Sequence, residues 1–391
     1  METLRIAILT ETLPPDSLKL QPWRYLGELA RALQDAGHEA SALTTEAGVP
    51  TWNGVRVDRH PDAIDFRSAR RLHRLVETRG YDAGIVRLTA GLFFSLHREP
   101  GTPPSKGRLI GIFLRPLHNG WDLARRFLDP TLVPEIRLDL HHAGLYASRR
   151  LGTWADPPPY VNDYAFLWES DRATGISAGL PAGSCHVVRH PFDPFFLDRR
   201  GAGLGSRLSG AFGPVPRRVI FSGPPEATRG SRDVVQLPSV LPRDPPTQVV
   251  LLLRDGRFPA PVVKRKRIGV HEVLAVHGLI TREELRAIYR TSHVAVFPYR
   301  FVRTGLPLVV LEAVAAGLPV VTTRIHPIRE LEGRTGLVFA RPRNPPDIAR
   351  AIESAFDDAQ RAAVVRKNDE WIRTTPDWFT VAKIFVSFVR R

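Results

Sequence analysis

The sequence predicts an α/β protein with two doubly wound domains, each a mostly parallel sheet covered by helices on both faces. Three observations support this fold class. The chain has 391 residues, more than a single hydrophobic core usually holds. Short apolar runs typical of buried strands alternate with segments of helical periodicity in both halves. No apolar run reaches the roughly 18–20 residues that a membrane-spanning helix needs.

The first half supplies the elements of one such domain. A strand is expected at residues 4–10, where the chain starts as a strand and turn and not as a signal peptide. Further strands are expected at 39–45, 54–60, 81–90, 107–115, 164–170 and 184–190, and helices at 21–37, 65–80 and within 119–154.

The segment 199–218 is rich in Gly, Ser and Arg and is predicted to be a linker. Its Gly-Ala-Gly-Leu-Gly run at 201–205 also resembles a dinucleotide-binding glycine pattern. However, no strand leads directly into that run and no helix follows it cleanly, which favours the linker interpretation.

The second half repeats the alternation. Strands are expected at 218–223, 247–256, 271–278, 293–299, 319–323 and 335–341, and helices at 231–241, 281–292, 305–317 and 344–358. Thr281 and Glu284 form the capping-box pattern at the start of one helix. The basic stretch 261–267, Pro-Val-Val-Lys-Arg-Lys-Arg, is expected to be an exposed loop with an open role toward phosphate or membrane.

These elements define the expected domain boundaries. The first domain is predicted to cover 1–195, a linker 196–217, and the second domain 218–373. The last segment, 374–391, is amphipathic and lies beyond the natural end of the second domain, so it must pack on an additional surface.

The composition restricts the partners and the compartment. Lys and Arg number 55 against 40 Asp and Glu, a net charge of +15, and only six of these cations are Lys. The Arg bias fits a GC-rich genome, yet the excess still favours anionic partners such as phosphorylated ligands or an acidic membrane surface. No nucleic-acid motif accompanies it, so no specific nucleic-acid partner is expected. The single cysteine, Cys185, excludes an internal disulfide and a cysteine-based metal site, and a cytoplasmic protein is expected, with peripheral membrane contact left open.

One carboxylate stands out within the apolar stretch 304–323. Glu312 lies on the same helical face as Leu308, Val309, Ala315 and Ala316, where its charge would be largely desolvated. A buried charge is costly without polar partners. The two hydroxyls of a ribose match its two acceptor oxygens, whereas a structural Arg is the alternative partner.

The start of the same helix indicates a phosphate site. Gly305 allows close approach of a ligand to the backbone, and Pro307 is tolerated in a first helical turn. Amides at a helix start carry the positive end of the helix dipole, and ligands of open parallel sheets bind beyond the carboxyl ends of the strands. A nucleoside diphosphate is therefore predicted, with phosphates at Gly305 and Leu306 and the ribose on Glu312.

The stretch 298–323, PYRFVRTGLPLVVLEAVAAGLPVVTT, closely resembles the nucleotide-sugar segment of GT-B glycosyltransferases of family 4, the retaining group. In that family a second glutamate, matched here by Glu312, holds the nucleotide ribose. The resemblance implies two Rossmann-like domains facing a cleft, an acceptor side in the first domain, a donor site in the second, and a C-terminal helix that crosses back onto the first domain. Asp193 matches an Asp at the end of the family's first domain.

The resemblance also implies roles for individual residues. Arg229 matches a lysine that clamps the donor diphosphate. The nucleotide-sugar site would comprise Gly223, Arg229, Gly278, Leu279, Ile280, Gly305, Leu306, Pro307, Leu308 and Glu312. On the acceptor side Arg115 and His118 are candidates, because the family places a histidine near this point.

Two positions depart from the family pattern. Thr304 stands where the first glutamate contacts the sugar or supports its leaving phosphate, and Pro224 stands where an Arg follows the strand glycine. Arg229, Thr304, Arg115 and His118 are the expected catalytic residues. The departures keep open a catalytically inactive GT-B nucleotide-binding protein, and a GT-B nucleotide-sugar epimerase is a further alternative.

The expected reaction is retaining transfer from a nucleotide-diphosphate sugar to a glycan, lipid or small-molecule acceptor. No cofactor or metal is expected. No Asp-x-Asp occurs, and His141 and His142 are adjacent, so both cannot face one metal from a helix.

Overall fold

The structure is a computed structural model that describes residues 2–13, 22–47, 50–60, 68–88, 107–117, 160–198, 208, 210–254, 258, 260–302 and 305–391. The chain divides into two compact units. Unit 1 comprises 1–191, 303–305 and 376–391, and unit 2 comprises 192–302 and 306–375. The first half of the expected linker at 199–218, with its glycine run, and the expected helices within 119–154 lie outside the described residues.

Unit 1 is built on an eight-stranded sheet of order β3-β4-β2-β1-β5-β6-β7-β8 among the residues that the structure describes. Its strands are parallel except for the short β3–β4 hairpin. The strands are β1 (Arg5–Leu13), β2 (Glu39–Ala47), β3 (Thr51–Trp52), β4 (Val55–Arg59), β5 (Ala83–Arg87), β6 (Arg108–Phe113), β7 (Asp163–Phe166) and β8 (Cys185–Val187). The helices are α1 (Trp23–Asp35), α2 (Ala69–Thr78), α6 (Glu169–Ser177), the 3-10 turn η3 (Ala182–Ser184) and α14 (Trp378–Arg390).

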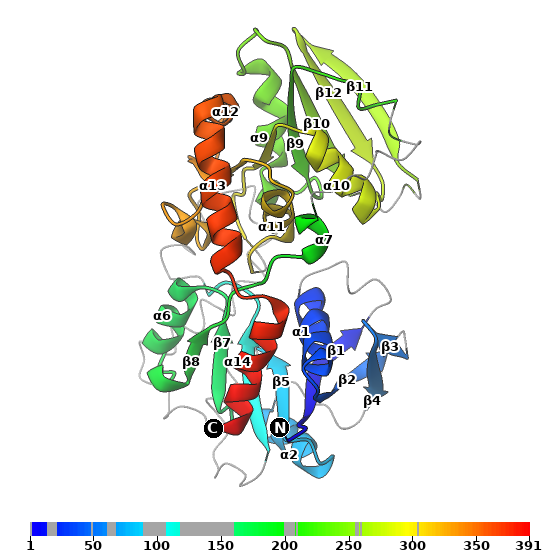
Figure 1. Ribbon diagram of the computed structural model, residues 1–391, viewed down its shortest axis with the longest axis vertical. Helices are drawn as coiled ribbons and strands as arrows, with labels where there is room; N and C mark the ends of the chain where they lie inside the picture. Colours follow the sequence, from blue (N-terminus) through cyan, green and yellow to red (C-terminus); the bar gives the residue numbers. More distant parts are fainter. Residues whose placement is uncertain are drawn as a thin grey trace. The chain divides into compact units, whose positions relative to one another are not determined.

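The last helix, α14, packs on α1 within unit 1 (Figure 1). The ring of Trp378 meets Tyr25 edge-on at 5.1 Å between centroids, and Phe388 stacks on His186 at 4.5 Å. Phe385, between them on the same helical face, has no exposed surface. The predicted return of the last helix to the first domain is confirmed.

Unit 2 contains a seven-stranded sheet of order β11-β12-β10-β9-β13-β14-β15 within its described part. Its strands are β9 (Arg217–Ser222), β10 (Thr247–Leu253), β11 (Val262–Ile268), β12 (His271–His277), β13 (Val294–Phe297), β14 (Val320–Thr323) and β15 (Val338–Ala340). Its helices are α7 (Pro194–Leu197), η4 (Ala227–Arg229), α9 (Ser231–Gln236), η5 (Leu237–Ser239), α10 (Arg282–Thr291), α11 (Leu308–Ala315), η6 (Ile328–Leu331), α12 (Pro345–Phe356) and α13 (Asp358–Thr374).

Most of the sheet is parallel and buried, as the apolar runs predict. β9, β10 and β13 are buried on both faces, because helices cover each side of a doubly wound sheet. The capping box at the start of α10 is present, with the Thr281 hydroxyl accepting from the Glu284 amide and the Glu284 carboxylate accepting from the Thr281 amide.

The basic stretch 261–267 is not a loop, which corrects the expectation from sequence. It forms β11, the edge strand that pairs antiparallel with β12. Its Lys and Arg side chains are exposed, while the backbone pairs with β12 along one side. Four consecutive cations give no alternation of apolar and polar residues, so the sequence pattern did not indicate a strand.

Candidate nucleotide-sugar site

The order of the sheet in unit 2 places a switch point between β9 and β13. From β9 the chain moves outward through β10 to β12, then returns to β13 on the other side of β9 and continues to β14 and β15. The loops that follow β9 and β13 therefore lie at the carboxyl ends of the strands next to the switch point, which is where doubly wound sheets bind ligands. Arg229 follows β9, and Glu312 follows β13.

The loop after β9 is held tightly against the loop after β13. The amides of Arg300 and Phe301 both donate to the Thr228 carbonyl, at 2.8 and 3.0 Å. Gly230 has a positive φ of 71°, and a Cβ atom there would lie 1.9 Å from the Pro298 carbonyl oxygen. Only glycine fits this approach, and it fixes the place of the preceding residue, Arg229.

A buried ion pair also joins the loop after β13 to α9. Both Nε and Nη2 of Arg300 donate to the carboxylate of Asp233 in α9, at 2.9 and 2.6 Å. The Arg300 side chain is 10% exposed and that of Asp233 is 2% exposed. This forked pair ties α9 to the segment after β13, so Arg300 serves the architecture of the site.

Arg229 lies beside a tyrosine at the end of β13. Its Nη1 donates to the Tyr299 hydroxyl at 3.3 Å, and its Nε is 3.8 Å from the Glu226 carboxylate. The guanidinium also lies over the Tyr299 ring at 5.8 Å. The Arg229 side chain stays 31% exposed, so its planar fork can still meet an incoming anion.

Glu312 is buried in α11 at 4% exposure and acts electrostatically on two buried tyrosines. Burial raises the pKa of Tyr289 well above its usual value, and the charge of Glu312 adds to the rise while Arg254 opposes it. Burial likewise raises the pKa of Tyr299, against the opposing charge of Arg229 and with a further contribution from Glu312. A carboxylate, two phenols and two guanidiniums therefore gather at this edge of the sheet.

Arg254 is a cation of this cluster that sequence reasoning missed. It is the exposed residue directly after β10, beside the end of β9 in the sheet. Pro224 removes an expected cation after β9, and Arg254 supplies one from the neighbouring strand. Its signal was a positive charge at the end of a wholly apolar run.

The segment 278–280 borders the same edge after β12. Gly278 has a φ of 106°, and a Cβ atom there would lie 2.9 Å from the Ala260 carbonyl oxygen. Leu279 is 48% exposed, unusual for a large apolar side chain, and Ile280 is partly exposed. Gly223, at the end of β9, lies under Arg229, whose Cδ would be 3.2 Å from a Cβ atom on Gly223.

The start of α11 differs from the expectation. The Gly305 amide does not point outward; it donates to the Leu114 carbonyl at 2.7 Å, and both residues belong to unit 1. A Cβ atom on Gly305 would also lie 2.2 Å from Cδ1 of Leu167, so a larger residue there would require that side chain to move. Pro307 is the N-cap of α11, one position before the first turn in which it was expected, and the buried Leu306 and half-buried Leu308 flank it.

Of the acceptor-side candidates, the structure describes Arg115, which belongs to unit 1. Arg115 is exposed after β6, and the Leu117 amide two residues on donates to the buried Asp171 carboxylate at 2.9 Å. His118, Thr304 and the pair His141 and His142 lie outside the described residues. Asp193, the matched Asp of the first domain's end, caps α7 in unit 2 and pairs with Arg282.

The described residues contain no group of three or more His, Cys, Asp or Glu arranged to hold a metal ion. Within the same residues, no helix combines the length and the apolar character needed to cross a bilayer.

The fold is of the GT-B class, as its structural neighbours show. The structure of alpha,alpha-trehalose 6-phosphate synthase from Burkholderia multivorans matches with a TM-score of 0.67 at 14% identity, covering 100% of this chain and 97% of that one. Over residues 234–358 the chain matches the family described as Glycosyl transferases group 1.

Two curated relatives from Mycobacterium tuberculosis match the chain. A glycogen synthase is 31% identical over 175 residues, which are 43% of this chain but only 41% of that protein. A GDP-mannose-dependent alpha-(1-6)-phosphatidylinositol monomannoside mannosyltransferase is 25% identical over 413 residues, 99% of this chain and 98% of that protein.

Proposed function

We propose that the protein is a glycosyltransferase that moves a sugar from a nucleotide-diphosphate sugar to a sugar, lipid-linked or small-molecule acceptor, with retention of configuration and without a metal or cofactor. One observation carries the proposal: Arg229 after β9 and Glu312 after β13 flank the switch point of the sheet in unit 2 and both act on Tyr299, and Glu312 lies in the part of the chain that matches group 1 glycosyltransferases. The GDP-mannose dependence named for one relative makes GDP-mannose the first donor to test.

In this proposal Glu312 accepts hydrogen bonds from the ribose hydroxyls. Its carboxylate is already desolvated, so a hydroxyl pair meets an acceptor that has little competition from water. The exposed Leu279 and half-buried Ile280 after β12 would form the apolar border of the base. Gly278 and Gly223 would let the nucleotide approach the two strand ends closely.

The diphosphate would meet Arg229 and Arg254. As the glycosidic bond breaks, negative charge builds on the leaving diphosphate, and preorganised cations stabilise it most at that point. The hydrogen bond to Tyr299 and the packing of Gly230 hold Arg229 in place before the substrate binds. Because the Gly305 amide is engaged, the remaining amides at the start of α11, with Leu306, Pro307 and Leu308 around them, would contribute less than the two arginines.

Arg115, His118 and Thr304 complete the proposal. Arg115 and His118 would serve the acceptor or the sugar, and Thr304 would offer a hydroxyl where the related enzymes have a glutamate. A lipid acceptor would require contact with an anionic membrane, which the net positive charge favours.

A binding-only protein is the second candidate, and the engaged Gly305 amide together with Pro224 favours it. The two candidates separate in one experiment. The purified chain is incubated with a panel of nucleotide sugars, GDP-mannose among them, and the released nucleoside diphosphate is measured, while thermal shift reports binding. Release of the nucleoside diphosphate supports the proposal that the protein is an enzyme. A raised melting temperature without that release supports the binding-only protein.

A further inference from the structure

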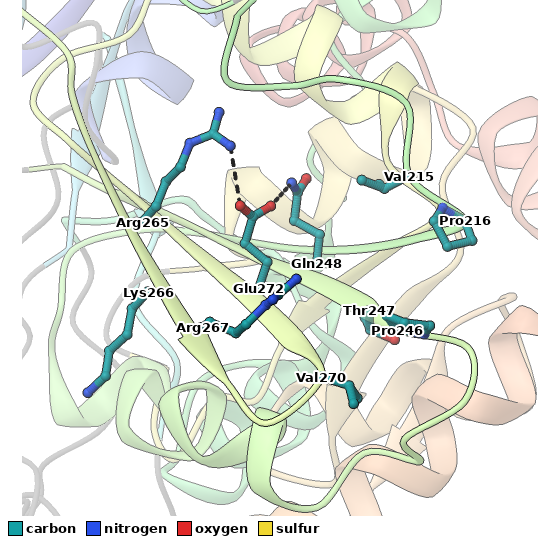
Figure 2. Close-up of a pocket in the computed structure, with 10 residues that line it drawn as sticks. All are labelled: Val215, Pro216, Pro246, Thr247, Gln248, Arg265, Lys266, Arg267, Val270 and Glu272. Carbon is teal, nitrogen blue, oxygen red and sulfur yellow. Dashed lines mark hydrogen bonds and ion pairs between the residues drawn. The ribbon is translucent and has the colours of Figure 1, made fainter.

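A pocket of about 400 Å³ lies at the amino end of β10 in unit 2 (Figure 2). The candidate donor site lies at the carboxyl ends of the strands of the same sheet. Thr247 and Gln248, the first residues of β10, line it, whereas Arg254 of the donor site follows the end of the same strand. Seven residues at about 3.3 Å each separate the two ends by roughly 20 Å. One small ligand cannot fill both sites.

A buried arginine organises one side of the pocket. Arg218, 2% exposed, donates to the Gln248 side-chain oxygen at 2.6 Å and to the Gly213 carbonyl at 2.6 Å. This orients Gln248 so that its Nε2 donates to the Glu272 carboxylate at 2.6 Å. The chain at 213–216, part of the wall, is thereby fixed without a ligand.

A second arginine fixes the opposite side. Arg265 in β11 donates to the Glu272 carboxylate at 3.2 Å and to the Gly210 carbonyl at 3.0 Å. Both oxygens of Glu272 are therefore engaged, one by Arg265 and the other by Gln248, as Figure 2 shows. The only carboxylate among the pocket-lining residues is thus neutralised by the protein itself.

The lining has two further cationic donors, Lys266 and Arg267. Arg267 lies opposite Glu272 in the strand register, and neither Arg267 nor Lys266 makes an ion pair within the described part of the chain. The Thr247 hydroxyl is buried and has no hydrogen-bond partner among the described residues. Arg265 offsets Glu272, so Arg267 and Lys266 remain as the two uncompensated cations of the lining, and the pocket favours a ligand that is anionic and rich in acceptors.

The other lining residues suit a carbon skeleton. Val215, Pro216 and Val270 contribute apolar surface, and Val270 is 42% exposed. A volume near 400 Å³ falls in the range of small-molecule sites, roughly 300–1,000 Å³.

We propose that this pocket is a second ligand site, distinct from the donor site, that binds a phosphate-bearing small molecule of sugar-phosphate size. The phosphate meets Arg267 and the carbon skeleton lies against Val215 and Val270. Since the walls are held by Arg218 and Arg265 beforehand, binding requires little reorganisation.

The test is calorimetric titration of the full chain with glucose 6-phosphate, in the presence of saturating GDP so that the donor site is occupied. Free glucose is the uncharged control ligand. Arg267→Ala should weaken binding about tenfold or more, the scale of one charge-assisted hydrogen bond.

Lys264→Ala is the matched control, because Lys264 belongs to the same exposed strand but does not line the pocket. The affinity of the Lys264→Ala variant for glucose 6-phosphate should stay within twofold of the wild-type value. Equal losses in the Arg267 and Lys264 variants would show general attraction to a basic surface and would overturn the site. No binding heat with millimolar glucose 6-phosphate, or a loss caused by Glu312→Gln and not by Arg267→Ala, would overturn it as well.

Binding to vesicles of phosphatidylglycerol is measured in parallel with the same variants. Retention of the chain on vesicles, with no binding of soluble glucose 6-phosphate, would replace the small-molecule site by a membrane-facing strand. This result leaves the proposed glycosyl transfer untouched, because that activity is assayed at the other edge of the sheet.

Discussion

Replacing Arg229 by alanine should slow turnover far more than it destabilises the fold. A unit charge about 4 Å from a phosphate contributes about 4 kcal/mol at an effective dielectric constant near 20. Glu226, 3.8 Å from the guanidinium, and the 31% exposure of the side chain reduce this value. We expect about 2–3 kcal/mol of transition-state stabilisation to be lost, which is a fall in kcat of roughly 30- to 150-fold.

The structural cost should be small. The ion pair with Glu226 is long and about one third exposed on both sides, so its removal costs at most about 1 kcal/mol. Arg229→Lys should recover part of the rate, because it keeps the charge and loses the fork. Arg232→Ala is the matched control, since it removes an exposed arginine three positions later.

The assay measures kcat and melting temperature side by side for these variants with the same nucleotide sugar. We expect a large fall in kcat for Arg229→Ala, a smaller fall for Arg229→Lys and none for Arg232→Ala, with all melting temperatures close to that of the wild type. A normal kcat in folded Arg229→Ala protein would refute the diphosphate role. A lowered melting temperature with normal turnover per folded molecule would assign Arg229 to the support of the loop instead.

Three further tests concern the packing. Gly230→Ala should lower both melting temperature and kcat, because its Cβ would clash with the Pro298 carbonyl oxygen after β13. The control Gly333→Ala has a similar φ of 77° but lies in open space, so it should show only the smaller effect of backbone strain in the same two assays. Phe385→Ala should cost about 3–5 kcal/mol in chemical denaturation, and Phe379→Ala, 46% exposed, much less; equal costs would count against the packing of α14 on unit 1. Burial raises the pKa of the Cys185 thiol to about 11, so it stays protonated at pH 8 and alkylation by iodoacetamide should need denaturant; rapid labelling of the native chain would contradict this.

The architecture could be predicted from local pattern. Apolar runs buried on both faces mark the parallel strands, and the capping residues Thr281 and Glu284 mark the start of α10. The amphipathic last segment, beyond the second domain, indicated α14 because an apolar face without a surface to cover is unstable. The helix α13 was not predicted, since its apolar residues are too widely spaced for a clear stripe.

The site was predicted less completely, because its parts depend on contacts distant in sequence. Glu312 was found from one charge in an apolar helix, a local signal. By contrast, the engagement of the Gly305 amide depends on a carbonyl about 190 positions earlier, and the nearness of Arg254 depends on the order of strands in the sheet. Spacing within one segment carries no information on either.

The most direct test of the donor site is calorimetric titration of the wild type and Glu312→Gln with GDP and with UDP. Glu353→Gln, which removes a carboxylate bound to Arg217 at the other edge of the same sheet, is the matched control. Loss of the charged acceptor for two ribose hydroxyls should weaken nucleotide binding by about 1.5–3 kcal/mol, roughly 10- to 150-fold. The melting temperature of the ligand-free Glu312→Gln variant is measured to check that the variant is folded. We expect that loss in Glu312→Gln and wild-type affinity in Glu353→Gln; unchanged nucleotide affinity in folded Glu312→Gln protein would contradict the ribose role of Glu312.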